Sequence, residues 1–143
     1  MKLSNNAGDY VTLKIDAYEF PKDDTDNWLL INGKVSLAGK SWTFRDPSLE
    51  TYEVQRLIKW LVKIADDLPS ATGIGFTEPN LEFIIIEEKF IRIYFELEAR
   101  PPWAPCDGAG MEDLFIDLEH NPQELRIAAL NLKEMLGNFP VRR

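Results

Sequence analysis

The spacing of apolar residues changes along this chain, and that change constrains the fold more than any other sequence feature. Between residues 9 and 19, apolar side chains occupy every second position, which is the pattern of a half-buried β-strand. From 51 to 68 they follow the spacing of about 3.6 residues that is typical of a helix. Alternation then returns, and a second helical pattern begins near residue 122. The sequence therefore predicts a sheet that packs on helices.

Two more strands are expected between the first strand and the first helix. The second strand covers residues 29–37, with Gly33 as the position of a bulge. A hairpin turn at 38–40 leads into a short third strand around 42–44. Pro47 breaks the pattern, and we expect the strand to end there because proline cannot donate a ladder hydrogen bond.

Two helices are expected, at 51–67 and 122–136. The first carries one continuous apolar stripe, and Ser48 or Thr51 would provide its N-cap. The second begins at Asn121, which has the side chain of an N-cap residue and is followed by a proline at the first helical position.

The second helix also has signals for its hydrogen bonding at both ends. Glu124 follows Asn121 at the spacing of a capping box, so its carboxylate is expected to help to cap the start of the helix. Gly137 stands where a helix commonly ends on a left-handed residue.

Four strands are expected between the helices. A short one lies at 74–76, and the next, at 81–86, is apolar at nearly every position, which is typical of a central strand covered on both faces. The third, at 91–99, alternates most clearly between apolar and polar residues, and the fourth covers 114–118. We expect the last two to be neighbours in the sheet.

This order of elements predicts an α+β fold in which residues 1–143 form a single domain. The expected architecture is one curved, mostly antiparallel sheet of about six to seven strands packed with two helices. The glycines of the predicted strands and turns are the points at which the sheet would bend: Gly33, Gly39, Gly73 and Gly75.

The rare reactive residues exclude several classes of site. Cys106 is the only cysteine and His120 the only histidine, so an internal disulfide, a multi-cysteine metal site and a two-histidine site are excluded. A pairing of Cys106 with His120 lacks any motif of an activated nucleophile. Asp117 and Glu119, beside His120, are interpreted as a strand end rather than metal ligands. We therefore expect no enzyme activity, no catalytic residue, no metal and no cofactor.

The charge of the chain limits its partners. It has 24 acidic and 16 basic residues, a net charge of −8 and a pI of about 4.7. Such a field repels phosphate backbones, so we expect no direct binding to nucleic acid and favour a basic protein as partner. No apolar stretch is long enough for a membrane helix, and the first residues lack the apolar core of a signal peptide. We expect a cytoplasmic protein that does not bind membranes.

Acidic residues gather in one part of the sequence. Residues 107–124 contain six acids and no Lys or Arg, and two further acids lie on the polar face of the strand at 91–99. If that strand pairs with 114–118, the acids form one surface, to which we add the tryptophan of a proline-rich segment as an exposed anchor. The expected partner-binding residues are Glu96, Glu98, Trp103, Asp113 and Asp117.

Three segments resemble the WapI-type immunity proteins of bacterial polymorphic-toxin systems. They are SWTFRDPSL at 41–49, FTEPNLEF at 76–83 and FELEARPPWA at 95–104. The likeness runs in order from about residue 9 to residue 140. The resemblance implies an intracellular, non-catalytic antidote that binds and neutralises a toxin domain, which in the founding case cleaves RNA. It provides no catalytic residues and no mapped contacts to transfer.

Two alternatives to an immunity protein stay open at this stage. One is a small-ligand-binding domain, or an enzyme that uses carboxylates in the concavity of a curved sheet; a pocket of converging carboxylates with raised pKa values would favour it. The other is a self-associating structural protein, since the sequence does not decide whether the chain forms a homo-oligomer.

Overall fold

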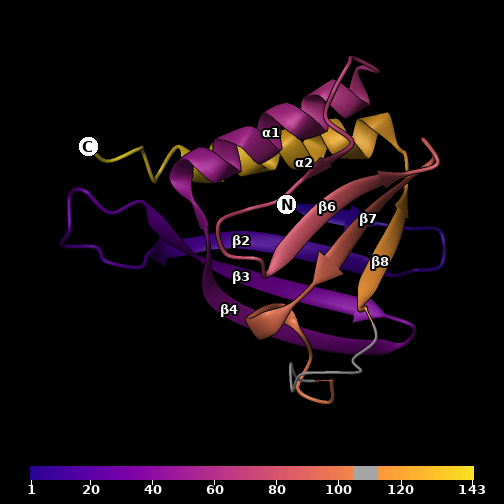
Figure 1. Cartoon of the computed structure of the whole chain (residues 1–143), viewed down its shortest axis with the longest axis horizontal. Coiled ribbons are helices and arrows are strands. Elements are labelled where there is room, and N and C mark those ends of the chain that lie inside the picture. Colours follow the sequence, from indigo (N-terminus) through magenta and orange to yellow (C-terminus); the bar gives the residue numbers. More distant parts are fainter. Residues whose placement is uncertain (105–112) are drawn as a thin grey trace.

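Two antiparallel sheets and two helices make up the part of the chain that the computed structural model describes, residues 1–104 and 113–143 (Figure 1). The first sheet has the strand order β1-β2-β3-β4 and the second β5-β6-β7-β8. The elements are β1 (Lys2–Ser4), β2 (Tyr10–Tyr18), β3 (Trp28–Leu37), β4 (Lys40–Glu50), α1 (Thr51–Ala65), β5 (Gly73–Ile74), β6 (Leu81–Ile86), β7 (Phe90–Phe95), a 3-10 turn (Leu97–Ala99), β8 (Phe115–Glu119) and α2 (Pro122–Leu136).

The α+β class and both helices were predicted, but a single curved sheet of six to seven strands was wrong. Eight strands form two separate sheets of four, and β1 is the strand that the sequence pattern did not indicate. Buried side chains from both sheets and both helices belong to one hydrophobic cluster. Trp60 of α1, for example, packs edge-to-face against Phe83 of β6, with ring centroids 6.1 Å apart.

The first sheet differs from its prediction at a glycine and at a proline. Gly33 is not at a bulge: it pairs with Leu13 and Phe44, and a Cβ atom here would overlap the Phe44 ring. Pro47 does not end the strand, because β4 runs on to Glu50. It is tolerated because β4 is an edge strand with an irregular register at this point.

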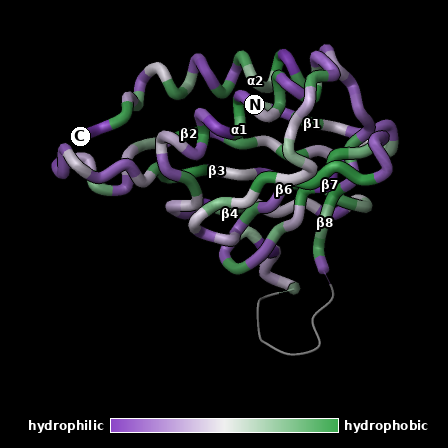
Figure 2. The backbone as a smooth tube through the Cα atoms, turned by 45° about the horizontal axis from the view of Figure 1, so that its top comes forward, coloured by the Kyte–Doolittle hydropathy of each residue, from purple (hydrophilic) through white to green (hydrophobic). Residues whose placement is uncertain are grey.

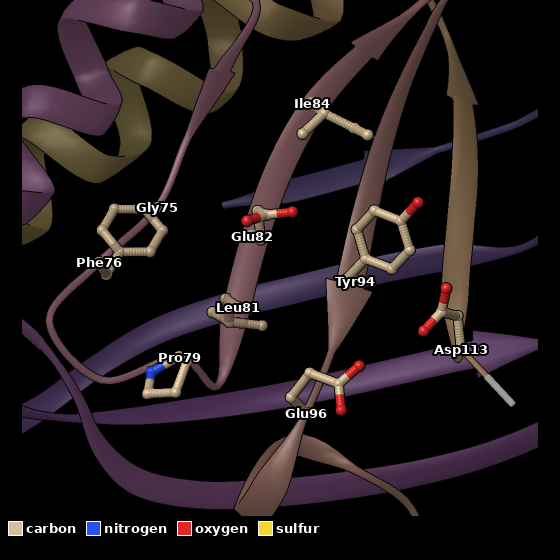
Figure 3. A pocket seen from close by; sticks show the side chains of 9 residues that line it. All are labelled: Gly75, Phe76, Pro79, Leu81, Glu82, Ile84, Tyr94, Glu96 and Asp113. Carbon is tan, nitrogen blue, oxygen red and sulfur yellow. The ribbon is translucent and has the colours of Figure 1, made fainter. Parts of the chain in front are cut away.

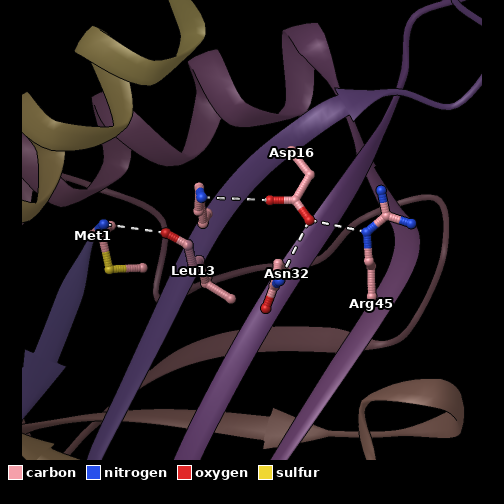
Figure 4. Close-up of polar contacts among 6 residues, drawn as sticks. Met1, Leu13, Asp16, Asn32 and Arg45 are labelled. Carbon is pink, nitrogen blue, oxygen red and sulfur yellow. Dashed lines mark hydrogen bonds and ion pairs between the residues drawn. The ribbon is translucent and has the colours of Figure 1, made fainter.

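The outer face of the first sheet is polar and held by side-chain contacts. Asp16 of β2 accepts hydrogen bonds from Arg45, at 2.9 Å, and from Asn32, at 3.3 Å (Figure 4). The hydrogen bond from Arg45 is the main cause that lowers the pKa of the Asp16 carboxyl. At the edge of this sheet, the N-terminal ammonium of Met1 donates to the Leu13 carbonyl oxygen, at 3.1 Å.

Both helix starts follow N-capping rules, with residues that differ partly from those expected. The N-cap of α1 is Glu50, not Ser48 or Thr51, and it forms a capping box with Glu53. The side chain of Asn121 caps α2 as predicted, by accepting from the Glu124 N–H, at 3.2 Å.

The ends of α2 show two further differences. The Glu124 carboxylate does not complete a capping box; it accepts from Ser4 of β1 and so ties α2 to the first sheet. Gly137 is the C-cap, but its φ of −56° is right-handed. Hydrophobic and hydrophilic segments alternate along α2 in Figure 2, as expected of a helix with one buried face. No helix in the described residues has the length and apolar character needed to cross a membrane.

The second sheet carries the candidate site, and two of its strands differ from their predictions. Its strand 81–86 is covered on one face only: Leu81 and Phe83 are buried, but Glu82 between them is exposed. The strand predicted at 91–99 ends at Phe95, because residues 97–99 turn into the 3-10 helix. β7 and β8 are neighbours, as predicted, with Arg92 opposite Asp117 and Tyr94 opposite Phe115.

Candidate functional site: an acidic groove on the second sheet

A groove of about 430 Å³ lies on the outer face of the second sheet, where β6 begins and β7 ends. Three carboxylates, those of Glu82, Glu96 and Asp113, are arranged around the Tyr94 ring in Figure 3. We call this feature the acidic groove. Its lining is completed by Gly75, Phe76, Pro79, Leu81 and Ile84.

Strand alternation brings these side chains to one face. Glu82 pairs with Tyr94, and Tyr94 pairs with Phe115, so the three lie in one row across β6, β7 and β8. Glu96 directly follows β7, and Asp113 lies two residues before β8. The groove therefore combines three chain segments that are separate in sequence.

None of the described residues that line the acidic groove is basic. Glu82 and Asp113 are exposed, and within the part of the chain that the structure describes neither side chain has a hydrogen bond or an ion pair. Glu96 has a cation nearby, since Arg100 Nη1 lies 3.6 Å from its Oε2 atom. The groove is thus a concave surface with an excess of negative charge beside an aromatic ring.

Asp117, in contrast, is already paired. Arg92 donates to both of its carboxylate oxygens, at 2.7 and 3.0 Å, and the guanidinium carbon lies 3.9 Å from the centre of the Phe115 ring. The hydrogen bond to Asp117 raises the pKa of Arg92 further above its ordinary value. The structure therefore places Asp117 outside the groove lining and next to an internal cation.

Glu98 and Asp46 form a second acidic group, beside Asn80. Asn80 donates its amide to Asp46 at 3.0 Å and to Glu98 at 3.4 Å. Burial raises the pKa of the Asp46 carboxyl, and the negative charge of Glu98 adds to that rise. The buried Oδ1 atom of Asn80 has no hydrogen-bond partner among residues 1–104 and 113–143.

The proline-rich segment contributes Arg100, which contacts the groove residue Glu96, and Trp103, which contacts the first sheet. Trp103 covers part of Trp42, with the rings edge-to-face and their centroids 5.8 Å apart, while its own side chain stays 51% exposed. Lys40 lies over its ring at 5.7 Å. Arg100 is 9% exposed and forms an ion pair with Glu96, a carboxylate of the groove.

Glu82, Phe76 and Tyr94 were not among the residues predicted for the site. The signal for Glu82 was present: one acid inside an apolar run that would otherwise be a fully buried strand. Read with period two, that position faces solvent. Phe76 carried no signal, because it lies in a connection whose path only the tertiary structure fixes.

Other candidate residues are distributed elsewhere. His120 Nε2 lies 3.1 Å from the Ile64 carbonyl oxygen, and Glu119 accepts from the Asn6 N–H at 3.1 Å. Among the described residues, no group of three or more His, Cys, Asp and Glu side chains is arranged to hold a metal ion. Cys106 lies outside the described residues, and so does its suggested pairing with His120.

Comparisons of the whole chain with known proteins gave one result. Neither the curated proteins nor the solved structures contain a match. A family model described as the immunity protein WapI-like family matches residues 2–140, which include both sheets, both helices and every residue of the acidic groove. The resemblance carried by the three short segments is therefore confirmed: the chain belongs to the WapI-like family of immunity proteins.

Proposed function

We propose that this chain is a non-catalytic immunity protein that binds and neutralises a toxin domain. In this proposal, basic side chains of the toxin enter the acidic groove. The observation that carries this proposal is the groove itself, whose described lining has three carboxylates, two aromatic rings and no basic residue. Family membership supports the partner class, and the net charge of −8 supports a basic toxin, such as a nuclease.

The second sheet already contains an example of the contact that we propose. Arg92 lies between the Asp117 carboxylate and the Phe115 ring, on the same face as the groove. A toxin arginine in the groove would meet the same chemistry, with Tyr94 as the ring and Glu82 and Asp113 as carboxylates. Because these two carboxylates have no internal partner in the described residues, a toxin cation would not have to displace one.

The five residues chosen from the sequence take different parts in this proposal. Glu96 and Asp113 contact the toxin inside the groove, and Glu98 and Trp103 contact it at the edge. Asp117 does not contact the toxin directly, because Arg92 neutralises its charge. We propose that the protein acts in the cytoplasm, and that binding blocks the toxin rather than altering it chemically.

The alternative to a toxin-binding surface is that the groove is the site of an enzyme or of a small-ligand-binding protein. Such a site would be favoured by carboxyl groups of raised pKa that converge in the pocket. Among the described carboxyl groups, burial raises the pKa of Asp46 and of Glu19, and neither residue lines the groove. This distribution favours a charged docking surface over an acid–base site.

Co-expression with the toxin domain encoded next to the gene tests the proposed function. We expect cells that produce the toxin domain to survive only when this protein is present, and to lose protection when Glu82→Gln and Asp113→Asn are combined. The matched control is Asp24→Asn with Glu134→Gln, which removes the same charge from two exposed sites outside the groove.

The outcomes separate the function from the site. If survival never depends on this protein and the two proteins do not form a complex, the immunity function for that toxin is wrong. If protection is complete with both double variants, the function stands and the groove is not the contact surface.

A further inference from the structure

A cleft of about 260 Å³ lies between α1 and the segment that leads into β5. Trp60 of α1 donates from Nε1 to the Ala71 carbonyl oxygen at 2.9 Å, and this bond holds the two walls together. Its lining residues on α1 are Arg56, Lys59, Trp60 and Lys63, and those on the facing segment are Ser70, Ala71, Gly73 and Ile74.

The charge of this cleft is opposite to that of the chain. Arg56, Lys59 and Lys63 are exposed, and none of the described residues that line the cleft is acidic. In residues 1–104 and 113–143, none of these three side chains has a hydrogen bond or an ion pair. The only acidic residue of α1, Glu53, is 1% exposed and uses both carboxylate oxygens for backbone N–H groups. Within the described part of the chain, the three cations therefore have no ion-pair partner.

The spacing of these cations places them on one face of α1. Lys59 follows Arg56 by three residues and precedes Lys63 by four, and like charges at these spacings repel one another. Lys63 lies in the last turn, where the helix dipole favours a cation, but Arg56 and Lys59 lack that compensation. A bound anion would remove the repulsion among all three.

The opposite wall adds hydrogen-bond donors. Among the described strands, β5 is an edge strand that pairs only with β6, so one side of its backbone has no strand partner there. Ser70 contributes a hydroxyl group that also donates. Positive charge on one wall and a hydroxyl donor on the other, without a carboxylate among the described lining residues, are the composition of an anion site.

We infer that this cationic cleft binds the phosphate group of a small ligand. Phosphate oxygens accept several hydrogen bonds at once, and a guanidinium pairs with two of them in the geometry that Arg56 provides. The small volume of the cleft fits a compact anion better than the broad surface of an acidic protein. The inference does not rest on the proposed function, because the site is separate from the acidic groove and is tested without a toxin.

Titration of the protein with pyrophosphate, followed by amide NMR signals at low ionic strength, tests the inference. We expect saturable shifts confined to residues 56–63 and 70–74, with inorganic phosphate binding more weakly at the same place. Lys59→Gln should raise the Kd about tenfold, because a charge-assisted hydrogen bond is lost. Lys22→Gln removes the same charge from an exposed connection and should leave the Kd unchanged.

Three results would overturn the site as described. Equal weakening by Lys59→Gln and Lys22→Gln would reduce the binding to the general field of the protein. A glutamate-rich peptide that binds as tightly as pyrophosphate would assign the cleft to carboxylates. A single-stranded oligonucleotide that binds where pyrophosphate does not would assign it to a nucleic-acid backbone instead of a small ligand.

Discussion

At the scale of single residues, Asp46 gives the clearest pH-dependent prediction. Its pKa is raised by burial and by Glu98, so its charged form costs stability near neutral pH. This cost grows as the pH rises through the raised folded-state pKa, and it vanishes at a pH below the unfolded value, where both states are protonated. Asp46→Asn removes the charge and keeps an oxygen that accepts from Asn80.

We expect Asp46→Asn to raise the Tm at pH 7 by about 1–4 °C, with a difference that shrinks as the pH falls toward 4. Thermal unfolding of the variant and the wild type at both pH values measures this. Asp24→Asn, in an exposed connection, serves as the control and should not show the same trend. A gain that is equal at both pH values would mean that the carboxyl charge is not the cause.

Individual residues also show where sequence reasoning reaches its limit. Asn121 was assigned its capping role in advance, because a local motif limits what its side chain can reach. Gly33 was misread: its role is to make room for the Phe44 ring of the neighbouring strand, and no local pattern contains that information. Glu82 was recoverable from alternation, but its neighbours Asp113 and Phe76 join it only through the tertiary fold.

At the scale of elements, the start of α1 depends on one buried carboxylate. Glu53 accepts from the Glu50 N–H at 3.0 Å and from the Thr77 N–H at 2.8 Å, so it caps the helix and also fixes the connection to β6. The contact with Thr77 positions the connection that contains Phe76 and Pro79, two residues that line the acidic groove.

We expect Glu53→Ala to lower the free energy of unfolding by about 2–4 kcal/mol, because two N–H groups lose their acceptor. Glu53→Gln should cost less, since the amide oxygen still accepts one of these bonds. Urea unfolding measures both variants against Gln55→Ala, at an exposed position of the same helix. A loss no greater than that of the Gln55 variant would contradict this role.

Helix positions were predicted closely, whereas strand ends were not. The helical stripes mark α1 and α2 because burial of one face repeats along the whole element. The end of β7 depends instead on the turn at Leu97–Ala99, and the length of β4 depends on its place at the sheet edge. The backbone N–H of Arg142 donates to Asn27 Oδ1 at 2.8 Å. This bond joins two segments that are distant in sequence, and no periodic pattern predicts it.

At the scale of the whole molecule, the division into two sheets was the feature that the sequence did not reveal. The sheets meet where Asn5, just after β1, donates from Nδ2 to the Asp117 carbonyl oxygen of β8, at 2.9 Å. Strand alternation reports only which face of a strand is buried, so it cannot distinguish one curved sheet from two sheets that share a core. The division leaves the outer face of the second sheet open for the acidic groove (Figures 1 and 3).

The central claim is that opposite charges at the acidic groove hold the toxin domain, and the salt dependence of the Kd tests it most directly. The measurement is calorimetric titration of the toxin domain encoded next to the gene, at low and at physiological salt. Three proteins are compared: the wild type, the groove variant Glu82→Gln/Asp113→Asn and the control variant Asp24→Asn/Glu134→Gln. We expect the groove variant to raise the Kd by about 10- to 100-fold and to weaken its salt dependence, while the control of equal charge stays close to the wild type. Equal Kd values and equal salt dependence for the two double variants would contradict the claim.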